Sequence, residues 1–135
     1  MKEWTLDATV ENIAVVNERI EAELDAIGCP MKAKMQIGIA VDELFGNIAH
    51  YAYGVGKGKA TVRFSAQENQ RGATLTFLDS GTPYDPLQKE DPNTALSASE
   101  RQIGGLGIFL VKKTMDDMTY SYRDGQNVLT ITKNW

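Results

Sequence analysis

The sequence predicts an α+β fold: a two-layer sandwich in which a mixed, mostly antiparallel sheet is covered by about three helices on one face. Three observations predict it. The elements run in the order strand, two helices, two strands, a long loop, one helix and two strands. Two pairs of consecutive strands have short links and therefore form antiparallel hairpins. Strand and helix do not alternate throughout, as they do in doubly wound parallel sheets. The 135 residues, 42% of them hydrophobic, suit a single domain over residues 1–135.

The first half of the chain contains one strand and two helices. Hydrophobic and polar residues alternate over residues 4–8, which predicts a strand. Over residues 13–27 hydrophobic residues recur at helical spacing, and Gly28 is suited to end that helix. A second helix with a hydrophobic stripe is predicted from about Met31 to Tyr53, where three closely spaced glycines break it.

The second half contains two hairpins separated by a loop and a helix. Residues 60–66 and 73–79 alternate and form the first hairpin. Residues 80–103 show no sustained periodicity and contain three prolines, and a loop of this length in a small domain is often a lid or a binding loop. A helix then begins near Gly105–Gly107, and strands over residues 118–122 and 128–132 complete the fold.

Composition excludes several classes of function. The net charge is −4 and no basic cluster stands out, so direct nucleic-acid binding is not expected. No hydrophobic run approaches a membrane-spanning length, and the start of the chain lacks a signal-peptide pattern. The single cysteine, Cys29, cannot form an internal disulfide, which fits a reducing compartment. We therefore expect a cytoplasmic protein with no membrane partner.

The predicted second helix carries a carboxylate and an amide on one face. Glu43 and Asn47 are four residues apart and lie beside the hydrophobic stripe. A carboxylate flanking a core can accept a proton from a hydroxyl group, and an amide oxygen can ligate Mg²⁺. An ordinary exposed helix with one Glu and one Asn is the alternative, and it stays open.

Asp79 ends the hydrophobic row of its predicted strand. It shares a face with Leu75 and Phe77, and burial of a charge there is costly unless a donor pairs with it. The amino group of adenine is a suitable donor, and Gly81 lets a base approach the backbone closely. An Asp-Ser-Gly turn at a strand end is common without any ligand, so that alternative remains.

A glycine-rich segment, Gly104-Gly105-Leu106-Gly107, precedes the apolar part of the third predicted helix. Backbone N–H groups at such a helix start attract anions, so phosphate groups fit there. No Gly-Lys-Ser/Thr follows, and no strand leads directly into it, so neither a Walker loop nor a dinucleotide fingerprint is indicated. A flexible hinge is the alternative.

The order and spacing of these three motifs are more specific than any one of them. Together they resemble the Bergerat-type ATP-binding fold of gyrase, heat-shock chaperones, histidine kinases and MutL, and the resemblance covers nearly the whole chain. The small size and the segments at residues 47–53 and 81–86 are most similar to the anti-sigma-factor serine/threonine kinases.

This resemblance implies ATP or ADP with Mg²⁺ as ligands and an ATP lid at about residues 82–104. It implies that Glu43 is the catalytic base, that Asn47 holds Mg²⁺ and that Asp79 binds the adenine amino group. The remaining residues that it assigns to nucleotide binding are Gly81, Gly105, Leu106 and Gly107.

Three further residues, His50, Lys89 and Arg101, each have two alternative roles. Family members often have a histidine four residues after the Asn, but here Tyr51 stands at that position and His50 comes one residue earlier. His50 can contact phosphate or face solvent. Lys89 and Arg101 in the lid are candidate partners of the γ-phosphate or solvated charges, and we place Arg101 among the nucleotide-binding residues.

The leading hypothesis is an ATP-dependent serine/threonine protein kinase. The resemblance of the chain to this family implies two partners: a small anti-sigma-antagonist (STAS-type) protein as substrate, and a sigma factor that the chain sequesters. A homodimer is also compatible with the family. The first alternative is a nucleotide-binding regulatory switch without phosphotransfer. The second, a detached catalytic domain of a sensor histidine kinase, is disfavoured because the chain shows no phosphoacceptor helix pair.

Overall fold

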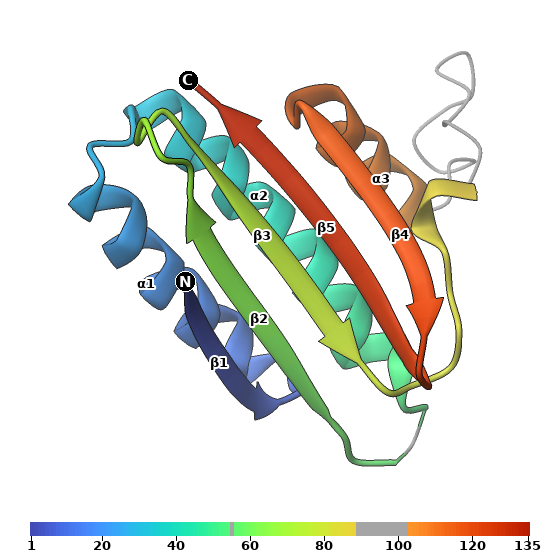
Figure 1. Cartoon of the computed structure of the whole chain (residues 1–135). Coiled ribbons are helices and arrows are strands. Elements are labelled where there is room, and N and C mark those ends of the chain that lie inside the picture. Colours follow the sequence, from blue (N-terminus) through green and yellow to red (C-terminus); the bar gives the residue numbers. More distant parts are fainter. Residues whose placement is uncertain (55, 89–102) are drawn as a thin grey trace.

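The computed structural model describes residues 1–54, 56–88 and 103–135. One layer is a five-stranded sheet and the other consists of helices (Figure 1). The elements in chain order are β1 (Lys2–Asp7), α1 (Glu11–Ala26), α2 (Met31–Asn47), a π-helix η1 (Ile48–Ala52), β2 (Lys59–Ala66), β3 (Gly72–Asp79), a 3₁₀-helix η2 (Pro86–Gln88), α3 (Ile103–Thr114), β4 (Asp117–Arg123) and β5 (Gln126–Asn134). The α+β class and the order of elements predicted from the sequence are confirmed.

The sheet has the order β1-β2-β3-β5-β4, and each pair of neighbours is antiparallel. The predicted sheet, mixed but mostly antiparallel, is therefore antiparallel throughout the described strands. Both predicted hairpins are present, β2 with β3 and β4 with β5. The hairpins join through the pairing of β3 with β5, whose register places Asp79 opposite Asn127.

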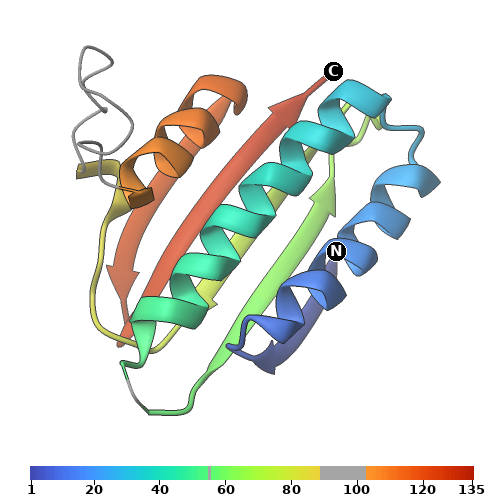
Figure 2. The same ribbon diagram turned by 180° about the vertical axis from the view of Figure 1, so that it is seen from behind.

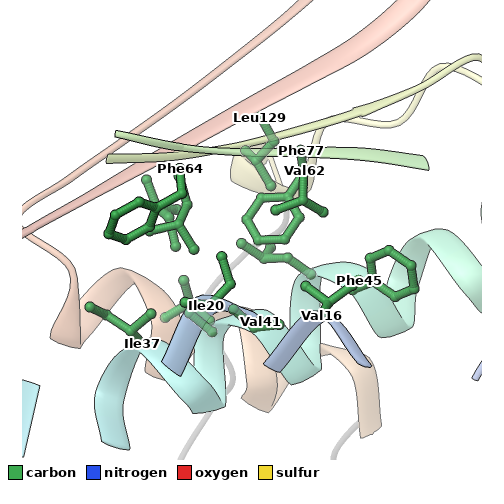
Figure 3. Packing of buried hydrophobic residues seen from close by; sticks show 14 of the residues in the cluster. Val16, Ile20, Ile37, Val41, Phe45, Val62, Phe64, Phe77 and Leu129 are labelled. Carbon is green, nitrogen blue, oxygen red and sulfur yellow. The ribbon is translucent and has the colours of Figure 1, made fainter. Parts of the chain in front are cut away.

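All three α-helices of the described chain cover the same face of the sheet (Figure 2). Their hydrophobic sides meet that face in the layer shown in Figure 3. Phe45 of α2 and Phe77 of β3 are almost completely buried there, as are Val16 and Ile20 of α1. Removal of this hydrophobic surface from water is the main source of the fold's stability. No helix in the described part of the chain is long and apolar enough to cross a membrane.

The second helix differs from its prediction at the C-terminal end. It was predicted to run to about Tyr53, but the α-helix ends at Asn47 and one wider π-turn continues it to Ala52. The carbonyl oxygen of Ala52 accepts a hydrogen bond of 2.8 Å from the Thr82 backbone N–H, in the segment after β3. Turns of this kind often lie at functional sites, where they redirect the groups that a helix presents.

The third helix begins at Ile103, slightly before its predicted start. Gly105 and Gly107 therefore lie within α3 and not in a turn before it. Of the predicted lid, residues 82–88 and 103–104 are described. Residues 89–102, with Lys89 and Arg101, lie outside the described residues, so those two assignments stay predictions.

Candidate functional site

Glu43 and Asn47 lie one turn apart near the C-terminal end of α2. Both are partly buried, as expected for residues that flank the hydrophobic stripe. Asn47 Nδ2 lies 3.5 Å from Glu43 Oε1, at the outer limit of a hydrogen bond. This contact uses the amide nitrogen and directs it towards the carboxylate, which leaves the Asn47 amide oxygen available as a ligand atom.

Gly107 of α3 lies directly against the Glu43 carboxylate. A Cβ atom built on Gly107 would lie 2.1 Å from Oε2 and 2.2 Å from Cδ of Glu43, far closer than atoms can approach. Any larger residue at 107 would therefore have to displace the carboxylate. The glycine makes the space in which Glu43 packs against the start of α3, and so it joins two motifs that are distant in the sequence.

Asp79 is buried at the end of β3, with 6% of its surface exposed. Its Oδ1 accepts two hydrogen bonds, from the Gly81 backbone N–H at 3.0 Å and from Asn127 Nδ2 at 2.9 Å. These two donors offset part of the cost of burying the carboxylate. The prediction that Asp79 shares the buried face of its strand with Leu75 and Phe77 is confirmed.

Asn127 of β5 is equally buried and connects Asp79 to the segment that follows β3. Its Nδ2 also donates to the carbonyl oxygen of Thr82, at 3.0 Å. Its Oδ1 accepts from the Tyr84 backbone N–H at 3.0 Å and from the Tyr120 hydroxyl. Burial raises the pKa of Tyr120, which keeps the phenol protonated as a donor.

Gly81 brings the backbone after β3 against the π-turn of α2. A Cβ atom on Gly81 would lie 2.1 Å from the carbonyl oxygen of Ala52. Because that neighbour is backbone, it cannot swing aside as a side chain can. Gly81 therefore has a structural reason to be glycine in addition to the predicted approach of a base.

The structure thus places the predicted site residues in two groups. One consists of Glu43, Asn47 and Gly107, and the other of Asp79 and Gly81. The π-turn links them, since it follows Asn47 directly and contacts Gly81. Gly105 and Leu106 lie in the first turn of α3, where the backbone N–H groups of a helix have no intrahelical partner.

His50 lies on the π-turn with an exposed side chain, and its ring centroid is 5.8 Å from that of exposed Tyr51. Asp42 is exposed on another side of α2, where its Oδ1 accepts a 2.5 Å hydrogen bond from Asn17 of α1. The neighbouring acid therefore faces α1, in contrast to Glu43, which faces α3.

Among the described residues, no group of three or more His, Cys, Asp or Glu side chains could hold a metal ion. The donor chemistry of Asn47 does fit Mg²⁺, because this cation commonly takes one or two protein oxygens, several waters and substrate phosphates. An amide oxygen beside a carboxylate is such an oxygen-rich setting.

Sequence reasoning missed Asn127. A signal was present, because Asn127 alternates with Leu129 and Ile131 as Asp79 alternates with Phe77 and Leu75. Each is a polar residue that ends a hydrophobic row. The predicted strand began at Val128, so Asn127 fell outside it, and only the pairing of β3 with β5 places the two polar ends opposite one another.

The relatives that this chain resembles are serine kinases. It is 31% identical over 103 residues to the serine/threonine-protein kinase BtrW of Bordetella bronchiseptica, covering 76% of this chain and 72% of BtrW. It is 26% identical over 129 residues to the serine-protein kinase RsbW of Listeria monocytogenes, covering 92% and 81%. RsbW of Bacillus thuringiensis is 24% identical over 131 residues, covering 94% and 81%.

The profile of one domain family matches nearly the whole chain, over residues 6–133, and its description is the histidine kinase-like ATPase domain. The match includes the second helix, the end of β3 and the start of α3, which carry the three motifs found in the sequence. The chain belongs to the histidine kinase-like ATPase domain family, and serine-protein kinases are among its relatives.

Proposed function

We propose that this chain is an ATP-dependent serine/threonine protein kinase that phosphorylates a small anti-sigma-antagonist protein of the STAS type and sequesters a sigma factor. The kinase activity follows the names of the relatives, which are serine kinases. The observation that carries the proposal is the position of Glu43, a carboxylate that packs against Gly107 of α3 one helical turn from Asn47.

In this proposal the adenine amino group donates to Asp79. The phosphates lie at the first turn of α3, where the N–H groups of Gly105 and Leu106 and the helix dipole attract anions. Mg²⁺ bound by the Asn47 oxygen and the phosphates would neutralise charge on the transferred group. Gly107 and Gly81 have no side chains, so the nucleotide can approach the backbone closely at these positions. Arg101 is a further candidate partner of the phosphates.

The reaction would proceed by in-line displacement. The Oγ atom of a substrate serine attacks the γ-phosphorus, so an O–P bond forms while the bond to the β,γ-bridging oxygen breaks, and ADP leaves with that electron pair. Glu43 accepts the hydroxyl proton. The missing side chain at Gly107 leaves the space that the Glu43 carboxylate occupies for that proton transfer.

A nucleotide-binding regulatory switch without phosphotransfer is the second candidate. The hydrogen bonds that Asn127 donates to Asp79 and Thr82 and accepts from Tyr84 favour it, because they tie the proposed base-binding carboxylate to the backbone after β3. In that case ATP or ADP would set the conformation of a partner-binding surface, and Glu43 would have no proton to accept.

Phosphate transfer from γ-labelled ATP separates the two candidates. The purified chain should be incubated with Mg²⁺, labelled ATP and serine-bearing partner proteins isolated from its own host by pull-down. Label on a partner serine, lost when that serine is changed to alanine, would support the kinase. A partner that binds with nucleotide-dependent affinity but never acquires label would support the switch.

A further inference from the structure

The amide side chain of Asn127 has all of its hydrogen-bonding capacity in use. Its two N–H groups donate to Asp79 Oδ1 and to the carbonyl oxygen of Thr82, and its oxygen accepts from Tyr84 and Tyr120. An amide offers two donors and two acceptor sites, so none is left over. Rotation of the amide by 180° would set donors against donors and acceptors against acceptors. The side chain is therefore held in one orientation.

This orientation has a consequence for Asp79. Both hydrogen bonds that the described residues give to its carboxylate end on Oδ1, from Gly81 and Asn127. Oδ2 receives none from them, and the side-chain oxygens buried in the described structure all have partners. Oδ2 is therefore not fully enclosed by the protein, and as a carboxylate oxygen it can only accept. A rotation that exchanged the two oxygens would have to break two hydrogen bonds first.

We propose that Asn127 is a positioning residue for base recognition: it holds Asp79 with Oδ2 as the acceptor, and it thereby makes the site select a purine with a 6-amino group over one with a 6-carbonyl group. This inference rests on the proposed ATP binding. Adenine offers an N–H donor to Oδ2, whereas the carbonyl oxygen of guanine would be set against the carboxylate.

The alternative is that Asn127 only stabilises the fold by pinning the segment from Thr82 to Tyr84. Both roles would weaken ATP binding when Asn127 is lost, so affinity alone does not separate them. Only the positioning role changes how much the 6-amino group itself contributes. The test is therefore a thermodynamic cycle, analogous to a double-mutant cycle, that combines a substitution in the protein with deletion of the 6-amino group from the ligand.

The cycle compares ATP with purine riboside triphosphate, which lacks the amino group, and with GTP, by calorimetry on the wild type and Asn127→Ala. In the wild type, deletion of the amino group should weaken binding roughly 10–100-fold, the range for a hydrogen bond to a charged acceptor. In Asn127→Ala the two ligands should bind almost equally, and the preference for ATP over GTP should shrink in parallel. Asn134→Ala is the matched control, because Asn134 ends the same strand and contacts Gln67 instead.

Asn127→Leu gives a second test if the alanine variant does not fold, because leucine keeps most of the side-chain volume but cannot donate to Asp79. The wild type alone gives a third: the side-chain N–H resonances of Asn127 should shift more with ATP than with the analogue. An unchanged ATP-to-analogue ratio in a folded variant, or equal shifts, would overturn the role of Asn127 and leave the proposed function standing. A wild type that binds neither ligand would overturn both.

Discussion

Glu43 and Asp79 are two carboxylates in different surroundings, and these differences suit different tasks. Asp79 is 6% exposed and its Oδ1 accepts two N–H donors, so it is held as a fixed acceptor. Glu43 is less buried and packs against the bare Cα of Gly107. A fixed acceptor suits recognition of a ligand, whereas a less enclosed carboxylate suits transfer of a proton.

Glu43→Gln should retain ATP binding and lose phosphotransfer by roughly 10²–10⁴-fold, the usual contribution of one acid–base group. Glutamine preserves the size of the side chain but cannot take the proton. Asp42→Asn is the matched control, since Asp42 is exposed and bonded to Asn17 of α1. Label transfer to the partner serine measures both variants, and a wild-type rate in Glu43→Gln would show that Glu43 is not the base.

Asp79→Asn should reduce ATP affinity by about 1.5–3 kcal/mol while the protein stays folded. Asparagine keeps one oxygen, which can still accept from Gly81 and Asn127, so the internal contacts survive. Its amide nitrogen then replaces the acceptor that the adenine amino group needs. Calorimetry with ATP and GTP measures the change, and equal affinity of the wild type for both nucleotides would contradict this recognition scheme.

At the scale of elements, contact between α2 and α3 brings the motifs together. The two helices pack side by side on the sheet (Figure 2). Gly107 permits the close contact at Glu43, and the π-turn at the end of α2 makes a second close contact with Gly81. Both contacts depend on the absence of a side chain, so small residues at two positions set how these elements meet.

Gly107→Ala tests the first contact. Alanine favours a helix over glycine by about 1 kcal/mol, and the three atoms nearest to the new methyl group belong to the flexible end of Glu43, so stability should not fall. The displaced carboxylate should lower phosphotransfer by about 10²-fold, the scale of a 1 Å misplacement. Thermal unfolding and label transfer measure the two effects.

Gly38→Ala in α2 is the matched control. Its Cβ would meet only Asn17 Oδ1, at 3.9 Å, which is an ordinary contact. It should therefore gain the same helix stability with no loss of phosphotransfer. Equal activities of the Gly38 and Gly107 variants would mean that the position of Glu43 does not matter for the reaction.

At the scale of the whole molecule, the hydrophobic core and the candidate site lie in different parts of the domain. The central hydrophobic residues lie between the sheet and the helices (Figure 3), and the candidate site lies where α2 and β3 end. A ligand that binds at that end interacts with several elements at once. Because such a ligand binds the folded state and not the unfolded chain, it must raise the stability of the whole domain.

MgATP at about one hundred times its dissociation constant should stabilise the fold by about 2.7 kcal/mol, which corresponds to a rise of roughly 10 °C in melting temperature for a domain of this size. MgGTP at the same concentration should give a much smaller rise, and Asp79→Asn should abolish the difference. Differential scanning fluorimetry measures these shifts. Equal shifts with both nucleotides would argue against an adenine-specific site.

The sequence by itself determined the α+β class, the order of elements and the polar residues that interrupt hydrophobic rows. These properties follow from local periodicity, which reports which face of an element is buried. The family was also recognisable from the order of three motifs, each common alone. The roles of Glu43, Asn47 and Asp79 remain predictions, as does the role of Arg101 outside the described residues.

Only the tertiary structure decided which residues meet. The pairing of β3 with β5 sets Asn127 against Asp79, the packing of α3 on α2 sets Gly107 against Glu43, and the π-turn brings Ala52 to Gly81. Periodicity describes the faces of single elements and carries no information on register or contact between elements distant in the chain. For that reason the sequence indicated the candidate carboxylates and glycines but neither the contacts between them nor the role of Asn127.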